Sequence, residues 1–502
     1  MWNRNEWIEK AEAIKPKLNH ENVYPVEQLD KRELHSGDSL ILDFGDHQVG
    51  YFVFHAMTAG SHQDAPAFLK FKFCESEREL SEDSSEYHGW ISRSWIQEVW
   101  MHIDVLPGVQ RMLRRFAFRY VKIEVIDLSS KYSLIIDDAY VDSVSSADDS
   151  SIEVFHGTEM EERIDQIAIR TLHNCMQDVF EDGPKRDRRL WIGDLRLQAL
   201  ANAATYRNYD LVKRCLYLFA GCTDEDGRVP ACLFLKPEIT GDDTYMFDYS
   251  LFFIAALEDY VFYSKDYETG RDLADVAIRQ WKLASRNFGE DHVIKDSDQI
   301  GWCFIDWNLD LNKQASAQFV YIYSLKKLTA LLQMLDEQHL RDFSENESQE
   351  LREEIQAKSR AAVKSFYQEN QGLFISGSNQ QISYATQSWA VLAGVFSEEK
   401  NRELLLRLKE NDRALKMVTP YMNHVYVEAL MEAGMLREAY EHMIYYWGGM
   451  VEDGADTFYE LFNPENPEES PYGSCMVNSY CHAWSCTPTY LMRIKLLREE
   501  CL

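Results

Sequence analysis

The hydrophobic residues of this chain change their spacing near residue 150, and that change constrains the fold more than any other feature. Before this point, apolar and charged residues alternate over most of Phe68–Phe73 and Tyr120–Val125. Alternation with a period of two places one face of a strand on a core and the other in water. After this point, apolar residues recur every three or four positions, which predicts helices. The chain is therefore expected to contain a β-rich part followed by a helical part.

The first part predicts an antiparallel β-sandwich over residues 35–150. Short apolar runs are separated by turn signals such as Pro107-Gly108, and several short strands with such turns are typical of a sandwich. The polar segment Asp142–Ser151 lacks periodicity and is interpreted as a linker. Residues 1–34 have mixed character and stay unassigned. The further runs are Ser39–Phe44, Tyr51–Thr58, Ile96–Leu106 and Tyr132–Val141.

The second part, residues 151–502, is long enough for about a dozen helices of ordinary length. Thr158 and Glu161 have the spacing of a capping box, and an apolar stripe follows them as far as Val179. Pairs of such helices could close into an α-helical barrel. No tandem repeat of fixed period is present, so a regular solenoid is not favoured. Similar stripes occur at Tyr321–Leu335, Leu351–Phe366 and Val425–Tyr446.

Composition argues against several classes of function. The 502 residues carry 52 basic against 83 acidic side chains, a net charge of −31, so a nucleic-acid partner is not expected. No long apolar run indicates a membrane-spanning helix. The ten cysteines contain no Cys-x-x-Cys pair, and no phosphate-binding glycine loop occurs, so neither a metal nor a cofactor is expected. Reduced thiols and the lack of a signal-peptide pattern at the start predict a cytoplasmic protein.

The densest polar cluster of the chain is Glu181–Asp194. It is predicted to be a loop because Gly183-Pro184 prevents the preceding helix from continuing. Trp191 offers a flat apolar face suited to a sugar ring, and the arginines of the loop could orient a neighbouring carboxylate or shift its pKa. A solvated loop whose charges pair with one another is the competing interpretation.

Carboxylates, aromatic rings and a histidine gather again near the C-terminus, in Gly454–Glu460 and Asn478–Trp484. Between the two clusters, Asp242–Asp248 and Gly301–Trp307 also place aspartates beside aromatic residues. A carboxylate accepts hydrogen bonds from sugar hydroxyls, and a tryptophan packs against a sugar ring. Taken singly, each segment is equally well explained by capping and packing.

Together, these motifs resemble the bacterial α-L-rhamnosidases of glycoside hydrolase family 78. The loop Asp182–Asp194 is similar to the signature loop of that family but one residue shorter, and Gly454–Glu460 is similar to the segment with its general base. Leu42–Gly45 and Phe118–Val121 are similar to short sequence motifs in the β-sandwich of that family. The resemblance covers roughly residues 40–490. It implies an N-terminal antiparallel β-sandwich followed by an (α/α)6 barrel, the catalytic domain, over residues 151–502.

The resemblance implies a hydrolase that releases terminal α-L-rhamnose, or a related 6-deoxy sugar, with inversion at the anomeric carbon. Inverting hydrolysis uses one protonated and one ionised carboxyl group, about 6.5–9.5 Å apart. Aligned backward from Gly193-Asp194, the loop has Asp187 at the position of the family's general acid. Aligned from its N-terminal end, the loop would instead have Arg188 at the position of the general acid. We therefore expect Asp187 to be the acid and Glu460 the base.

The resemblance also implies a set of substrate contacts. Acidic side chains would bind sugar hydroxyls, tryptophans would form apolar walls for the methyl group of the sugar, and the histidine would contact a hydroxyl. If both Arg186 and Arg188 pointed at Asp187, that carboxyl would stay ionised and could not donate a proton. The full set is Asp182, Arg186, Trp191, Asp194, Asp248, Asp306, Trp307, His482 and Trp484.

Two alternatives stay open at this point. The arginines of Arg186–Arg189 would suit a polysaccharide lyase, which can use a cation to neutralise the carboxylate of a uronic acid. A non-catalytic sugar-binding relative would keep the pocket and lose the acid. Because one scaffold hosts several chemistries, the fold does not decide among them. A carbohydrate is the expected partner in each case, and the formation of a homo-oligomer stays open.

Overall fold

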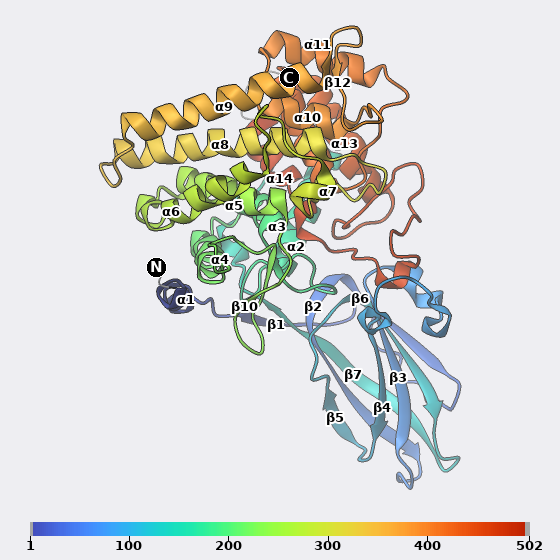
Figure 1. The fold of residues 1–502 in the computed structure, drawn as a ribbon. Helices are drawn as coiled ribbons and strands as arrows, with labels where there is room; N and C mark the ends of the chain where they lie inside the picture. Colours follow the sequence, from blue (N-terminus) through green and yellow to red (C-terminus); the bar gives the residue numbers. More distant parts are fainter. Residues whose placement is uncertain (1–3, 497–502) are drawn as a thin grey trace.

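The computed structural model describes residues 4–496, which form a β-domain followed by a helical domain (Figure 1). The strands between Asn19 and Ser145 lie at one end of the molecule and most of the helices at the other, with short strands such as β12 (Leu373–Phe374) among the helices. This order confirms the change of fold class predicted from the hydrophobic spacing. Residues 1–3 and 497–502, at the ends of the predicted segments, lie outside the described residues. None of the described helices is both long and apolar enough to cross a membrane.

Antiparallel strands of the β-domain form one sheet in the order β1-β7-β2-β6-β3-β4, with β5 paired to β2. Strand β2 joins the two halves of this sheet, because Ser39–Asp43 pairs with β6 and Gly50–Gly60 pairs with β7. The two runs predicted at 39–44 and 51–58 are therefore one strand with an irregularity between them. The strands are β1 (Asn19–Val23), β2 (Ser39–Gly60), β3 (Ala67–Cys74), β4 (Glu98–Ile103), β5 (Gly108–Arg111), β6 (Phe116–Asp127) and β7 (Tyr132–Ser145).

The core of the β-domain is built from phenylalanines that alternate along the strands. Phe52 and Phe54 of β2 and Phe71 and Phe73 of β3 are almost wholly buried. The rings of Phe73 and Phe116 stack with their centroids 4.0 Å apart. These side chains form the inward face that a period of two predicts.

Two boundaries of the β-domain differ from the prediction. Asp142–Ser145, expected at the start of the linker, belongs to β7, because β1 pairs with this stretch and uses its backbone hydrogen-bonding groups. Within the unassigned residues 1–34, α1 (Arg4–Ala13) packs against α4 (Tyr209–Gly221) of the helical domain, as Figure 1 shows. The first residues of the chain therefore contribute to both domains.

Helices of the second domain alternate between an inner and an outer ring. All 13 residues of α3 are buried, against 5 of the 22 in α9, which places α3 inside and α9 outside. The inner helices are α3 (Ile192–Ala204), α5 (Phe247–Ser264), α8 (Gln314–Glu337), α10 (Tyr384–Leu392), α12 (Pro420–Glu432) and α14 (Pro488–Tyr490), which continues into a π-helical turn (Leu491–Leu496). The outer helices are α2 (Glu159–Cys175), α4, α6 (Tyr267–Ala284), α9 (Glu345–Phe366), α11 (Glu398–Lys409) and α13 (Leu436–Glu452).

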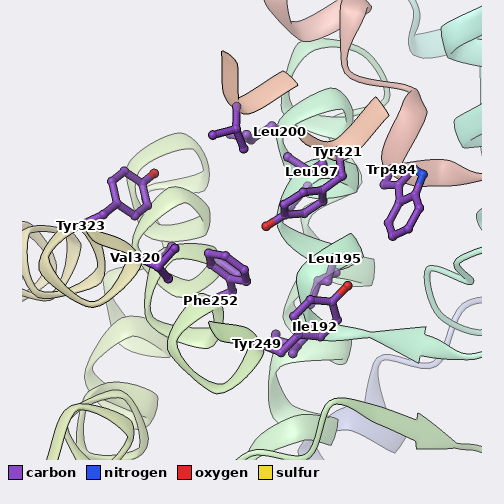
Figure 2. Packing of buried hydrophobic residues seen from close by; sticks show 14 of the residues in the cluster. Ile192, Leu195, Leu197, Leu200, Tyr249, Phe252, Val320, Tyr323, Tyr421 and Trp484 are labelled. Atoms are coloured by element: carbon purple, nitrogen blue, oxygen red, sulfur yellow. The ribbon is translucent and has the colours of Figure 1, made fainter. Parts of the chain in front are cut away.

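The inner ring closes on itself. Its helices contact one another in the order α3, α5, α8, α10 and α12, and the segment with η7 (Ala483–Ser485) and α14 contacts both α12 and α3. Hydrophobic side chains from facing helices fill the interior, among them Phe252, Val320 and Tyr421 (Figure 2). This closure confirms the predicted (α/α)6 barrel.

Two apolar stripes are interrupted in the structure. Helix α2 ends at Cys175 and does not reach Val179, because Met176 and Phe180 form a β-bridge that begins the next loop. The stripe Val425–Tyr446 belongs to two helices, α12 and α13. They are separated at Gly434, whose φ of +65° is left-handed and ends the first helix.

Ion pairs join the two domains, one set of them buried and one partly exposed. Lys185, in the loop before α3, donates to Glu79 of the β-domain at 2.7 Å, and its ammonium lies 3.8 Å from Glu75. All three side chains are buried. Arg78 of the β-domain donates to both oxygens of Asp453 at 2.9 and 2.6 Å. Because a buried charge without a partner is strongly unfavourable, these pairs fix the β-domain against the ring.

We predict that Lys185→Met lowers the free energy of unfolding by about 3–5 kcal/mol, because it leaves the buried carboxylate of Glu79 without its cation. Chemical denaturation followed by tryptophan fluorescence measures the change. The matched control is Lys131→Met, which breaks an exposed pair with Asp64 and should have a much smaller effect. Equal effects of the two substitutions would contradict the importance of the buried pairs.

Candidate active site

A cavity of about 280 Å³ lies where the β-domain meets the helical ring. Its wall comes from segments far apart in the chain: a loop of the β-domain, the loops before α3 and α8, and the chain after α13. Both residues of the predicted acid–base pair are among its lining residues. The cavity brings together nine of the eleven predicted site residues, namely Asp182, Arg186, Asp187, Trp191, Asp194, Trp307, Glu460, His482 and Trp484.

Asp182 organises the loop that carries Asp187. Its carboxylate accepts the backbone N–H of Asp187 at 3.3 Å and that of Arg189 at 3.0 Å. Burial, and after it the negative charge of Asp187, raises the pKa of Asp182 well above its usual value. A side chain at Gly183 would meet the backbone oxygen of Arg186 at 2.5 Å, so the tight path of the loop requires glycine.

Arg186 and Arg188 of this loop have hydrogen-bond partners other than Asp187. Arg186 donates Nη2 to the carboxylate of Glu460, and Arg188 donates Nε to the backbone oxygen of Lys185 at 3.3 Å. Within residues 4–496, neither arginine forms an ion pair with Asp187. The arrangement that would hold Asp187 ionised, with both arginines pointing at it, is therefore not present.

Both carboxylate oxygens of Glu460 accept hydrogen bonds. Tyr472 donates its hydroxyl to Oε1 at 2.5 Å, and Arg186 donates Nη2 to Oε2. Trp484 donates Nε1 to the backbone oxygen of Glu460 at 2.9 Å, which holds the main chain as well. Since a carboxylate offers about four lone-pair sites, each oxygen keeps one for a further donor. Glu460 is thus oriented and still able to accept a proton.

Asp194 and His482 form a second buried pair at the wall of the cavity, with Nε2 and Oδ1 3.1 Å apart. Burial alone lowers the pKa of His482, but the hydrogen bond with Asp194 and the nearby charge of Glu460 raise it above its usual value. Nδ1 of His482, Nε1 of Trp191 and Nε1 of Trp307 are buried without a hydrogen-bond partner in the described part of the chain. Unsatisfied polar atoms are rare in folded proteins, and three of them at one cavity point to a functional site.

The other two predicted residues, Asp248 and Asp306, do not line the cavity. Asp248 is fully buried and accepts the backbone N–H groups of Phe304 and Ile305 at 2.8–3.0 Å. Asp306 accepts the hydroxyl and the N–H of Thr419 at 2.7 and 3.1 Å. We therefore correct their predicted role: they hold the segment that brings aromatic rings to the cavity wall, and substrate contact is not indicated for them.

Several residues of the cavity are not among the predicted site residues. Three of them, Trp90, Ile91 and Trp95, come from the β-domain. The aromatic residues of 87–95 stand out in the sequence, but nothing there indicates which distant segment they meet. The remaining lining residues are Arg189, Asp242, Thr244, Met246, Tyr249, Trp302, Phe304 and Tyr472.

The charged groups of the cavity are carboxylates, arginines and a histidine. Carboxylates and histidines donate and accept protons, which is the basis of general acid–base chemistry. In the described part of the chain, no three or more His, Cys, Asp or Glu side chains are placed to hold a metal ion. The nine cysteines that the structure describes are free thiols.

Two family models match the chain. The glycosyl hydrolase family 78 α-rhamnosidase N-terminal domain matches residues 7–143. The bacterial α-L-rhamnosidase six-hairpin glycosidase domain matches residues 156–495. A search of curated proteins found no match.

Solved structures include close relatives of this fold. The chain is similar to a rhamnosidase from Klebsiella oxytoca with rhamnose bound, at 43% identity and a TM-score of 0.92, over 97% of this chain and 98% of that one. It is also similar to a family 78 rhamnosidase of Bacillus sp. GL1, at 19% identity and a TM-score of 0.77, over 90% of this chain and 46% of that one. An α-L-rhamnosidase from Dictyoglumus thermophilum matches at 16% identity and a TM-score of 0.70, over 95% of this chain and 51% of that one. The last two matches show a shared fold, and this chain spans about half of their length.

We predict that Asp248→Asn loosens the cavity wall, because the new amide group would oppose the backbone donors of Phe304 and Ile305. The free energy of unfolding should fall by about 1–3 kcal/mol, and the near-ultraviolet circular dichroism of the aromatic wall should weaken. Asp412→Asn, at an exposed aspartate, is the matched control and should change neither measurement. An unchanged denaturation curve for Asp248→Asn would refute the positioning role.

Proposed function

The chain belongs to glycoside hydrolase family 78, the α-L-rhamnosidases, and we propose that Asp187 and Glu460 are the general acid and base of an inverting reaction. The protein is a glycoside hydrolase that releases α-L-rhamnose. One observation carries the assignment of the two residues: although far apart in the sequence, their side chains line the same cavity. Rhamnose, the sugar bound to the Klebsiella oxytoca relative, is the proposed occupant of this cavity.

In the proposed mechanism, Asp187 gives its proton to the glycosidic oxygen as the bond to the aglycone breaks. Glu460 removes a proton from the water that attacks the anomeric carbon from the opposite face. Each turnover leaves Asp187 ionised and Glu460 protonated, and exchange with solvent restores both. Asp187 is only half-buried, so solvent can reach it for this exchange.

The polar and apolar residues of the cavity suit the two sides of a 6-deoxy sugar. We propose that Asp182, Asp194 and His482 bind its hydroxyl groups. The rings of Trp191, Trp307 and Trp484 would face its apolar surface and its methyl group, and among them Trp484 stacks on Phe304 at 5.6 Å. Arg186, predicted as a substrate contact, donates to Glu460 and is better placed to orient the base.

The two alternatives are not favoured. A lyase would need an arginine available to the carboxylate of a uronic acid. Arg186 is engaged by Glu460 and Arg188 by Lys185 and Gln97, which leaves Arg189 at the cavity, but both family models that match the chain are those of α-rhamnosidases. A non-catalytic binding protein would lack the acid, whereas a carboxyl group lines the cavity at the predicted acid position. Formation of an unsaturated uronide, which absorbs in the ultraviolet, would support the lyase alternative.

Three finer expectations stay proposals. Free thiols suit a reducing compartment, which supports a cytoplasmic location. The net charge of −31 supports the absence of a nucleic-acid partner. The formation of a homo-oligomer and the identity of the aglycone stay open, and a screen of nitrophenyl glycosides would compare α-L-rhamnoside with other 6-deoxy and pentose sugars.

We predict that Glu460→Gln and Asp187→Asn each lower the turnover of 4-nitrophenyl α-L-rhamnoside at least about a hundredfold, as the loss of a general acid or base does. Initial rates with this substrate measure the loss. Glu465→Gln, at an exposed glutamate in the loop after the base, is the control and should keep the wild-type rate. A near-normal rate in Glu460→Gln or Asp187→Asn would remove that residue from the mechanism.

The two roles can be separated by the leaving group. A strongly activated aglycone departs with little help from a proton, so the loss caused by Asp187→Asn should shrink when dinitrophenyl replaces nitrophenyl. The loss caused by Glu460→Gln should be the same for both aglycones. If the loss caused by Glu460→Gln shrinks with dinitrophenyl and the loss caused by Asp187→Asn does not, the acid and base assignments would be exchanged.

We predict that the first rhamnose released is the β anomer, because a water attacks the face opposite to the departing aglycone. Proton NMR recorded during the first minutes, before the anomers equilibrate, measures the ratio of the two. Release of the α anomer would indicate a covalent intermediate and a nucleophilic carboxylate, and would overturn the inverting mechanism.

A further inference from the structure

Tyr472 connects the carboxylate of Glu460 to the β-domain. Its hydroxyl donates to Oε1 of Glu460 at 2.5 Å, and the side chain is almost wholly buried. Burial, and after it the negative charge of Glu460, raises the pKa of Tyr472 well above its usual value, so the hydroxyl stays a donor. The proposed acid–base mechanism gives this residue no role.

Tyr472 and Arg186 hold the two oxygens of the same carboxylate and also contact each other. The guanidinium of Arg186 lies over the tyrosine ring, 4.2 Å from its centroid. Since Arg186 donates to Oε2 and Tyr472 to Oε1, the carboxylate of Glu460 is restrained at both oxygens. Each of the two donors is in turn held in place by the other.

The β-domain packs against the outer side of Tyr472. The ring of Trp90 lies 5.5 Å from that of Tyr472, and its Nε1 donates to the backbone oxygen of Pro471 at 2.8 Å. A side chain at Gly89 would lie 2.1 Å from the backbone oxygen of Tyr472, so the two loops touch along their main chains. Tyr472 also shares a small apolar cluster with Tyr87 and Ile96 of the β-domain.

Trp90 does not hold its position by burial, since its side chain is 70% exposed. An exposed indole gains little from the hydrophobic effect, so its fixed place must come from its hydrogen bond and from its contact with Tyr472. The same ring lines the cavity. Trp90 is therefore placed to influence the site without being part of a domain core.

We propose that Tyr472 is a positioning residue for the general base and that Trp90 of the β-domain acts on catalysis through Tyr472. The proposal rests on the proposed role of Glu460. A general base must be held within about 0.5 Å of its productive place, and small displacements reduce rates strongly. The β-domain thereby completes the active site of the barrel.

The first test is Tyr472→Phe, assayed with 4-nitrophenyl α-L-rhamnoside. kcat should fall about tenfold or more, at the low end for losing a hydrogen bond to a charged group, while KM changes less than about threefold. The acidic limb of the pH profile of kcat/KM should move to higher pH, because the loss of a donor disfavours an ionised carboxylate. A merely structural role would alter stability without moving this limb.

The second test is a double-mutant cycle between Trp90 and Tyr472. Trp90→Ala should lower kcat about threefold in the wild-type background and have no further effect in Tyr472→Phe, since both changes act through one contact. Trp90→Phe, which keeps a ring on Tyr472, should restore most of the rate. If Trp90→Ala fails to fold, Trp90→Leu replaces it in the cycle.

Matched controls are Tyr445→Phe, at a tyrosine that is 56% exposed, and Trp100→Ala, at a tryptophan of β4 that is 55% exposed. Both should keep the wild-type kcat and pH profile. An unchanged kcat and pH profile in Tyr472→Phe, or effects that multiply in the double variant, would overturn the proposal. Normal turnover in Glu460→Gln would instead refute the assignment of the base, so the two failures are distinguishable.

Discussion

Buried carboxylates that need hydrogen-bond donors determine how this protein is built around its cavity. A carboxylate removed from water is unfavourable unless donors or cations replace its hydration. Asp248 and Asp306 meet this requirement with N–H groups of 304–305 and 418–419, and Asp182 does so with N–H groups of its own loop. Because the donors belong to the main chain, each carboxylate fixes a whole segment. These buried carboxylates therefore also fix the positions of the segments that surround the cavity.

The charged loop before α3 follows the same rule. In the sequence, it is equally compatible with a solvated loop whose charges pair with one another. In the structure its charges separate, because Lys185 and Arg188 reach the β-domain, Arg186 reaches Glu460, and Asp187 faces the cavity. Lys185, Arg186 and Arg188 are each neutralised or hydrogen-bonded elsewhere, and none of them forms an ion pair with Asp187 among the described residues. This separation lets one loop supply both the proposed acid and a group that holds the proposed base.

The sequence predicts those features that depend on local pattern. The change of hydrophobic period reveals the order of the two domains, and nine of the eleven residues predicted from ordered motifs line the cavity. It does not predict where a helix stops for tertiary reasons, as α2 does at Cys175. Nor does it distinguish a carboxylate facing a ligand from one that binds the main chain, because Asp248 and Asp194 are both aspartates in the first turn of an inner helix. The contact of Trp90 with Tyr472 likewise cannot be predicted from the sequence. Hydrophobic periodicity indicates which face of a helix or strand is buried, but not which segment packs against it.

The boundary between the domains in the sequence is not the boundary of the active site. The loop of 78–97 in the β-domain contacts the segments that carry the proposed acid and the proposed base, through Gln97 to Arg188 on one side and through Trp90 to Tyr472 on the other. Lys185 adds a buried charge that only the β-domain neutralises. A barrel without this domain would leave these side chains unpaired at the positions that hold Asp187 and Glu460. The geometry of the proposed acid and base is therefore a property of the two domains together, although both residues belong to one of them.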